Sequence, residues 1–316
     1  MKEIGGYIEF EKFHSAMLYD DGIKLNCGRN AFAYLIESKN IRKVRFPRMM
    51  CDSNDKVLSR NGLEVRYYSI GRDLKMEDIS LDDDEWLYIV NYYGQLSDER
   101  ILSLKKKYDR IVVDNAQAYF QRPLAGVDTI YTCRKFFGVT DGAVLYTDRE
   151  INRELPYDES FQRMNFLLGR FERTASEFYG EYAANNDMFF DEPLKRMSRL
   201  TENILHGIDY GYIENRRTEN FRLYHEALKS VNKLELSIAN GAFMYPLYIE
   251  NGTDIRKKLI SMKIYAPTLW PNVFDRCNET DAEYDLASNI IPLPCDQRYS
   301  DDEINYVIEA IKQCIN

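Results

Sequence analysis

The chain has 316 residues, of which 45% are hydrophobic, and a formal net charge of −9. This is enough apolar material for a large core and for more than one domain. The acidic balance argues against nucleic-acid binding, because like charges repel. No apolar run approaches the roughly 20 residues of a membrane helix, and the N-terminal segment lacks the apolar stretch of a signal peptide. We therefore expect a cytoplasmic protein without membrane or nucleic-acid partners.

Cysteine and histidine spacing predicts no metal site. The cysteines are far apart and form no CxxC pair, so free thiols are expected. The three histidines have no metal-ligand spacing, and HExxH is absent. GxGxxG and GxxxxGK[ST] are also absent, which argues against a plain nucleotide-binding domain.

The first half of the chain alternates strand and helix signals. Short apolar runs predict strands, and apolar spacing of three and four predicts helices. In chain order we predict a helix at 29–38, strands at 43–47, 64–70 and 86–92, a helix at 97–108 capped by Ser97, and strands at 110–114, 128–134 and 143–147. This alternation is typical of an α/β fold with a mostly parallel sheet and helices on both faces.

The second half is richer in helix signals. We predict helices at 158–185, 196–207, 210–230 and 254–264, a strand at 243–250, and a terminal helix from Ser300, which forms a capping box with Glu303. The change in character predicts two domains. The first, at 1–190, is a large α/β domain, and the second, at 191–316, is a smaller α+β domain.

Residues that follow the predicted strands are candidates for chemistry, because ligands of open parallel sheets lie beyond the carboxyl ends of the strands. Asp114 ends one strand and Lys135 follows another. Tyr92, Tyr93 and Gly94 end a third. Each signal has a plainer interpretation: a strand-end aspartate is usually a turn residue, a lysine beside an arginine is usually a solvated charge, and such tyrosines usually belong to the core.

Together these features suit pyridoxal phosphate. That cofactor needs an amine for covalent attachment, a carboxylate on its pyridine nitrogen and a cradle for its phosphate. A lysine and a strand-end aspartate supply the first two. The helix that begins after Gly28 offers free N–H groups and the positive end of its dipole to the third.

In this order the motifs resemble those of the DegT/DnrJ/EryC1/StrS family of aminotransferases, a branch of the aspartate-aminotransferase superfamily. They read CGRNAFAYL, NYYG, DNAQA and RKFFGVTDGAVLYTD. The segments KRMSRLTENIL and ENRRTENF are similar to the family's dimer-contact helices, and IPLPCDQRYSDDEINYVIEAI to its last strand and helix. The resemblance covers the chain from about residue 24 and implies fold type I of the pyridoxal-phosphate enzymes.

The resemblance implies roles for three residues around the cofactor ring. Lys135 would be the catalytic Schiff-base lysine and the proton carrier. Asp114 would pair with the pyridine nitrogen, and Gln117 would lie near the ring's hydroxyl oxygen. Dehydratase-type relatives have histidine in place of this lysine, so Lys135 favours a transaminase over a dehydratase.

The resemblance also implies a phosphate site. Gly28, Arg29 and Asn30 would bind the cofactor at the start of the first helix, the first two through backbone N–H groups. Thr132 would offer a hydroxyl group. Arg196 would reach the site of a neighbouring subunit, because the family's active sites lie at a dimer interface.

One position departs from the family pattern. The family's ring-stacking aromatic would fall near Cys51, in the segment PRMMCDS. Either Met50, Cys51 or one of Tyr92 and Tyr93 covers the ring, or the site is altered. We include Cys51 and Tyr93 among the predicted cofactor-binding residues.

The resemblance implies an aminotransferase that moves an amino group from an amino acid such as glutamate to a keto sugar. The sugar would be carried on a nucleotide and used for cell-surface glycans, and the enzyme would be a homodimer. The alternative is a non-catalytic relative that keeps the scaffold for binding or regulation. Arg216, Arg217 and Arg298 would either bind a carboxylate or diphosphate or form surface ion pairs, as exposed arginines commonly do.

Overall fold

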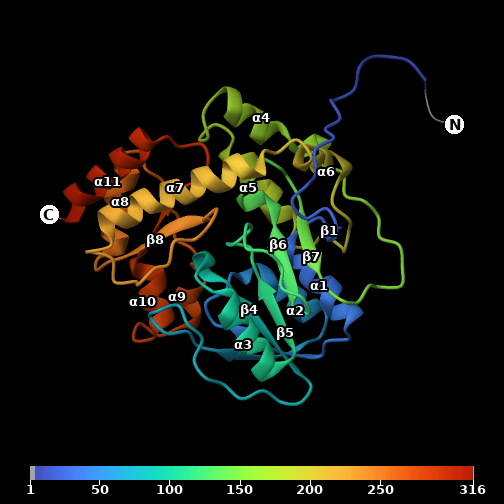
Figure 1. Cartoon of the computed structure of the whole chain (residues 1–316), viewed down its shortest axis with the longest axis horizontal. Coiled ribbons are helices and arrows are strands. Elements are labelled where there is room, and N and C mark those ends of the chain that lie inside the picture. Colours follow the sequence, from blue (N-terminus) through green and yellow to red (C-terminus); the bar gives the residue numbers. More distant parts are fainter. Residues whose placement is uncertain (1–3, 316) are drawn as a thin grey trace.

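The computed structural model describes residues 4–315 and contains a seven-stranded sheet in the order β1-β7-β6-β5-β4-β2-β3. These strands lie in the middle of the view in Figure 1. Their bounds are β1 Ile23–Leu25, β2 Lys43–Pro47, β3 Glu64–Tyr68, β4 Glu85–Val90, β5 Ile111–Asp114, β6 Asp128–Thr132 and β7 Ala143–Tyr146. The helices of this half are α1 Gly28–Ser38, α2 Asp55–Arg60 and α3 Asp98–Tyr108.

The sheet is mostly parallel, and β7 is the exception. β2 to β6 pair in parallel, whereas β7 runs antiparallel to both β6 and β1. The segment 133–142 between β6 and β7 holds a single 3₁₀ turn, η3 (Cys133–Lys135). A parallel return needs a crossover of about a dozen residues or more, usually a helix. The short connection therefore reverses the chain, and it carries Lys135.

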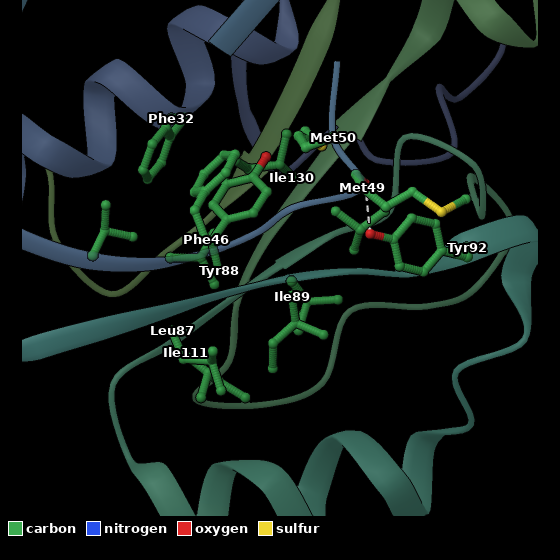
Figure 2. Close-up of a cluster of buried hydrophobic side chains, with 14 of the residues drawn as sticks. Phe32, Phe46, Met49, Met50, Leu87, Tyr88, Ile89, Tyr92, Ile111 and Ile130 are labelled. Carbon is green, nitrogen blue, oxygen red and sulfur yellow. Dashed lines mark hydrogen bonds between the residues drawn. The ribbon is translucent and has the colours of Figure 1, made fainter. Parts of the chain in front are cut away.

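The core beneath the carboxyl ends of the strands is aromatic. The ring of Tyr88, from β4, lies 4.5 Å from that of Phe46 and 4.8 Å from that of Phe32, measured between centroids. Figure 2 shows Phe46 and Tyr88 lying against each other, and the hydroxyl of Tyr92 donating to the carbonyl of Met49. These rings fix the ends of β2 and β4 relative to α1.

The C-terminal part has its own core around a two-stranded sheet, β8 (Met244–Tyr248) with β9 (Ile290–Pro294). Its elements, coloured orange to red in Figure 1, gather on one side of the molecule, and α7 packs against β8. The helices that follow β7 in the chain are α4 Asn165–Glu172, α5 Tyr179–Met188, α6 Arg199–Leu205, α7 Tyr210–Leu228, α8 Gly252–Ser261, α9 Val273–Arg276, α10 Ala282–Asn289 and α11 Asp301–Ile315. We call the part built from α7, α8, α11, β8 and β9 the C-terminal unit.

Two predicted caps are confirmed. The hydroxyl of Ser97 accepts the N–H of Arg100 at the start of α3. Before α11, the carboxylate of Glu303 accepts the N–H of Ser300, 2.9 Å away, and the N–H of Glu303 returns to the Ser300 hydroxyl. Both helices therefore begin where the sequence places them.

The predicted fold class is confirmed, but one predicted helix is wrong. Residues 158–185 form the separate helices α4 and α5. The helix α4 ends before Arg173, whose φ and ψ of −137° are not helical, and the ring of Phe178 then packs on Gly169, where a Cβ would fall 2.3 Å from it. The predicted strand at 86–92 ends at Val90, and Tyr92 belongs to the 3₁₀ turn η2 (Tyr92–Gly94). No helix within residues 4–315 is long and apolar enough to cross a membrane.

Candidate functional site

Asp114 ends β5 with its side chain buried in the aromatic core. One carboxylate oxygen accepts the hydroxyl of Tyr88 at 2.9 Å, and the other accepts the N–H of Ala116 at 2.8 Å. Burial raises the pKa of Asp114, and the positive charge of Lys135 opposes part of that rise. The positive charge of Lys135 therefore acts on the carboxylate of Asp114.

Lys135 is exposed and stands at the end of η3. Its Nζ lies 5.2 Å from the centre of the Phe243 ring. Among the described residues its amino group has no hydrogen bond or ion pair. The amine is therefore held by the backbone of η3 and by a ring face, and it is open to an incoming carbonyl compound.

The start of α1 lies against the end of β6. A Cβ on Gly28 would fall 2.9 Å from the hydroxyl oxygen of Thr132, so the absence of a side chain permits this approach. No side chain caps this end of α1. Within residues 4–315 the Thr132 hydroxyl has no hydrogen-bond partner. The end of the helix and this hydroxyl therefore share a space suited to an anion.

Two arginines meet at this helix end without a carboxylate partner within the described chain. Burial and the nearby charge of Arg29 both lower the pKa of Arg134, and both guanidinium groups act on the buried thiol of Cys27. The Nη1 group of Arg29 is buried and has no hydrogen-bond partner among residues 4–315. Two confined cations favour a bound anion, because an unpaired buried charge is costly.

Both cations stack on the segment that follows α5. The guanidinium of Arg134 lies 4.7 Å from the centre of the Phe189 ring, and that of Arg29 lies 4.6 Å from the centre of the Phe190 ring. Arg134 also donates to the side chain of Asn186. These contacts place Phe189 and Phe190 as a wall beside the start of α1.

Asn30 has a side chain that is fully occupied. It donates to Asn26 at 2.8 Å and to the carbonyl of Pro193 at 2.7 Å, and it accepts from Arg60 at 2.9 Å. Its side chain therefore fixes α1 to neighbouring segments and has no group left over to bind a ligand.

Gln117 and Tyr93 are connected by a hydrogen bond. The side-chain carbonyl of Gln117 accepts the N–H of Tyr93 at 2.8 Å, and Tyr93 has a φ of 54°, a conformation that costs energy in a residue with a side chain. Within the described chain the Gln117 NH₂ group has no acceptor, so it is free to donate. The ring of Tyr93 is buried and packs edge-on against Trp270, with the centroids 6.1 Å apart.

Cys51 follows β2 at the same edge of the sheet. Its thiol is partly exposed and lies 2.7 Å from the hydroxyl of Ser53. Met50 beside it is buried, with 5% of its surface exposed, and the ring of Tyr92 lies against Trp270. Of the four side chains considered for the ring face, Cys51 is thus the one that remains accessible.

Arg196 lies at another place in the chain's fold. Its guanidinium is 5.7 Å from the centre of the Tyr157 ring, and it lines a cavity of about 340 Å³ with Lys24 and Leu25 among its neighbours. Asp114 and Lys135 do not line this cavity.

Of the three arginines predicted either to hold an anion or to form surface ion pairs, two form ion pairs. Arg216 pairs with Asp301 and Glu219, and Arg298 pairs with Asp296. Neither interpretation fits Arg217. It is buried, with 2% of its surface exposed, and its partners are backbone and amide oxygens.

Sequence reasoning missed Tyr88 and Arg134. Tyr88 pairs in register with Val112, two positions before Asp114, so both side chains point to the same face of the sheet. That register is the signal that could have identified it. Arg134 received no role of its own, because nothing in the sequence indicates that Phe189 lies beside it.

Metal ligation has no support in the part of the chain that the structure describes. All six cysteines are free, and no cluster of three histidine, cysteine or acidic side chains is arranged to hold an ion within residues 4–315.

Comparison with known proteins identifies the fold. No family model and no curated protein matches the sequence. Among solved structures, the sugar aminotransferase CalS13 from Micromonospora echinospora is similar with a TM-score of 0.61, 16% identity and coverage of 92% of this chain and 86% of that one. NtdA from Bacillus subtilis, solved with bound cofactor PMP, has a TM-score of 0.66, 15% identity and coverage of 93% and 73%.

A DegT DnrJ EryC1 StrS aminotransferase from Brucella abortus matches with a TM-score of 0.60 and 16% identity, over 92% of this chain and 85% of that one. At these identities the likeness concerns the path of the backbone. The chain therefore has the fold of the solved sugar aminotransferases, as its own motifs predict.

Proposed function

We propose that the protein is a pyridoxal-phosphate-dependent aminotransferase of the DegT type that transfers an amino group from an amino acid to a keto sugar. The observation that carries this proposal is the electrostatic coupling of Lys135, which follows β6, to Asp114, which ends the adjacent strand β5, with the start of α1 packed against the end of β6. These residues would supply the three parts that the cofactor needs.

The residues fit the cofactor's charges. Asp114 is a buried carboxylate without an ion pair in the described chain, which suits the protonated pyridine nitrogen. At the other end, Arg29, Arg134, the start of α1 and the Thr132 hydroxyl suit a phosphate dianion. Gln117 offers its free NH₂ group to the ring oxygen. Bound there, pyridoxal phosphate supplies an electron sink for the bond changes at the amino-bearing carbon.

Lys135 holds and moves protons in this proposal. Its amine is the attachment point for the cofactor and then the base that takes the proton from the donor's α-carbon. The Phe243 ring beside Nζ and the buried aromatic residues around η3 limit the paths that the amine can take. Asp114 would hold a proton on the pyridine nitrogen of a bound cofactor through its negative charge.

Cys51 takes the position of the ring-stacking residue. A thiol is smaller than an aromatic ring and gives a weaker contact, so cofactor affinity depends more on the phosphate end of the site. Two confined arginines at that end are consistent with this balance.

The keto-sugar substrate and the homodimer extend the proposal. The solved neighbours named as sugar aminotransferases support the sugar. Large apolar side chains are exposed on and beside α4 and α5, among them Phe171 at 92% and Tyr179 at 67%, which supports burial against a second copy. In such a dimer Arg196 would complete the partner's site.

A half-reaction tests this function. Protein loaded with pyridoxal phosphate is mixed with glutamate and other common amino acids, and conversion of the cofactor to its amine form is followed by absorbance and by mass spectrometry. We expect conversion with at least one donor and return to the starting form with a nucleotide-linked keto sugar. A protein that binds the cofactor but converts it with no donor would instead be the non-catalytic relative.

A further inference from the structure

Arg217 joins the C-terminal unit to the turn that carries Lys135. From α7 its Nη2 donates to the carbonyl of Phe136, 3.2 Å away, and its Nη1 donates to the carbonyl of Ala242, 2.9 Å away. Its Nε donates to the side chain of Gln297 at 2.7 Å. All three acceptors are neutral oxygens, so the guanidinium acts as a fixed fork between chain segments.

Each of these two carbonyls belongs to a residue that is next in sequence to Lys135 or to Phe243. Phe136 directly follows Lys135, and Ala242 directly precedes Phe243, whose ring lies beside Nζ. The NH₂ group of Gln297 donates to the same Phe136 carbonyl at 2.9 Å. The buried side chain of Arg217 therefore holds the backbone next to Lys135 and also the backbone next to Phe243, whose ring lies beside the amine.

The guanidinium also stacks on the ring of Phe136, 4.7 Å from its centre. Within η3, the N–H groups of Phe136 and Phe137 both return to the carbonyl of Cys133, at 2.9 and 3.0 Å. The carbonyl of Phe136 points the other way, to Arg217 and Gln297. The N–H groups of the turn therefore bond within the turn, whereas the carbonyl of Phe136 bonds to side chains from the C-terminal part of the chain.

We infer that Arg217, assisted by Gln297, is a positioning residue that holds Lys135 in place for attachment and proton transfer. This rests on the proposed function for its catalytic consequence, but the restraint on the turn is a property of the protein alone. Lys135 needs such support because, within residues 4–315, its amino group has no hydrogen bond or ion pair of its own. Small displacements of a reacting amine cost large factors in rate.

Arg256 provides a matched control. It is also a buried arginine of the C-terminal unit, and it holds the carbonyls of Ala287, Ser288 and Ile290. These carbonyls belong to α10 and β9 and are distant in sequence from η3. Arg217→Lys and Arg256→Lys each keep a positive charge and lose the planar fork, so both should lower the melting temperature.

The readouts are amide hydrogen exchange at 133–139 in the apo protein and the half-reaction rate per bound cofactor. Arg217→Lys should speed exchange in that segment by about tenfold and slow the half-reaction by about tenfold or more, with the donor's KM changed much less than kcat. Arg256→Lys should leave exchange at 133–139 unchanged and should slow the half-reaction much less than Arg217→Lys. If Arg217→Lys fails to fold, Gln297→Leu replaces it, since it removes both one donor to Phe136 and the acceptor of the Arg217 Nε with little change in volume.

Two results would overturn the inference. One is unchanged exchange at 133–139 in both Arg217→Lys and Gln297→Leu. The other is a half-reaction rate per bound cofactor equal to that of Arg256→Lys. Failure of the proposed function looks different, because the wild type itself would then not attach the cofactor to Lys135, whereas the exchange readout would still respond to Arg217.

Discussion

The hydroxyl of Tyr88 donates to the Oδ2 of Asp114 across 2.9 Å, inside a core of aromatic rings. The tyrosine and the aspartate come from adjacent parallel strands, β4 and β5. This hydrogen bond stabilises the carboxylate form of an aspartate that burial pushes towards protonation. It therefore opposes part of the rise in the pKa of Asp114 that burial causes, which favours the charged form that the proposed cofactor's nitrogen needs.

Replacing Tyr88 by phenylalanine should destabilise the protein in a pH-dependent way. Loss of a hydrogen bond to a charged group costs about 1.5–3 kcal/mol, and the cost should shrink at low pH, where Asp114 is protonated. Urea unfolding of the apo protein at several pH values measures this. Tyr68→Phe is the control, because the hydroxyl of Tyr68 donates to the backbone carbonyl of Tyr88 at 3.0 Å. Equal pH dependence in the two variants would rule out the role of Tyr88.

Asp114→Asn should stabilise the apo protein relative to the wild type as the pH rises. Burial raises the pKa of Asp114 above its ordinary value of 3.8. In the pH window above that value the folded wild type binds more protons than the unfolded chain, so its stability falls with increasing pH. The asparagine variant lacks this term. Urea midpoints from about pH 4 to neutral should show the variant gaining on the wild type, and a constant difference would contradict the shift.

Arg134→Gln should reduce the protein's preference for the cofactor's phosphate. We expect the ratio of affinities for pyridoxal phosphate and pyridoxal to fall by about tenfold, as for the loss of one charge-assisted contact. Inorganic phosphate should also raise the melting temperature of the apo wild type more than that of the variant. Arg122→Gln is the control, because Arg122 is exposed and stacks on Tyr19. An unchanged ratio would remove Arg134 from the phosphate site.

The strand-end residues could be predicted from sequence because the rule behind them is topological. Parallel strands bring their carboxyl ends to one edge, so Asp114 and Lys135 had to meet if β5 and β6 were neighbours. The order of the motifs resembles that of a family in which these two strands are neighbours, and this resemblance predicted the pairing of β5 with β6. To predict that Tyr88 is a partner of Asp114, one would have needed only the register of β4 against β5 in addition.

Other features depend on contacts between distant segments. The break between α4 and α5 lets Phe178 pack on Gly169, a contact that helical spacing does not reveal. Arg217 was interpreted from its charge, yet its burial is set by carbonyls of Phe136 and Ala242, far away in the sequence. The domain boundary between 190 and 191 and the role of Arg196 remain predictions.

Borohydride reduction of the protein with pyridoxal phosphate, followed by peptide mapping, tests the central claim most directly. The reaction fixes the cofactor to the lysine that holds it. We predict one modified peptide, carrying the label on Lys135, together with a visible absorbance band that Lys135→Ala abolishes. A label on a different lysine, or a wild type that stays colourless and unlabelled with excess cofactor, would contradict the account.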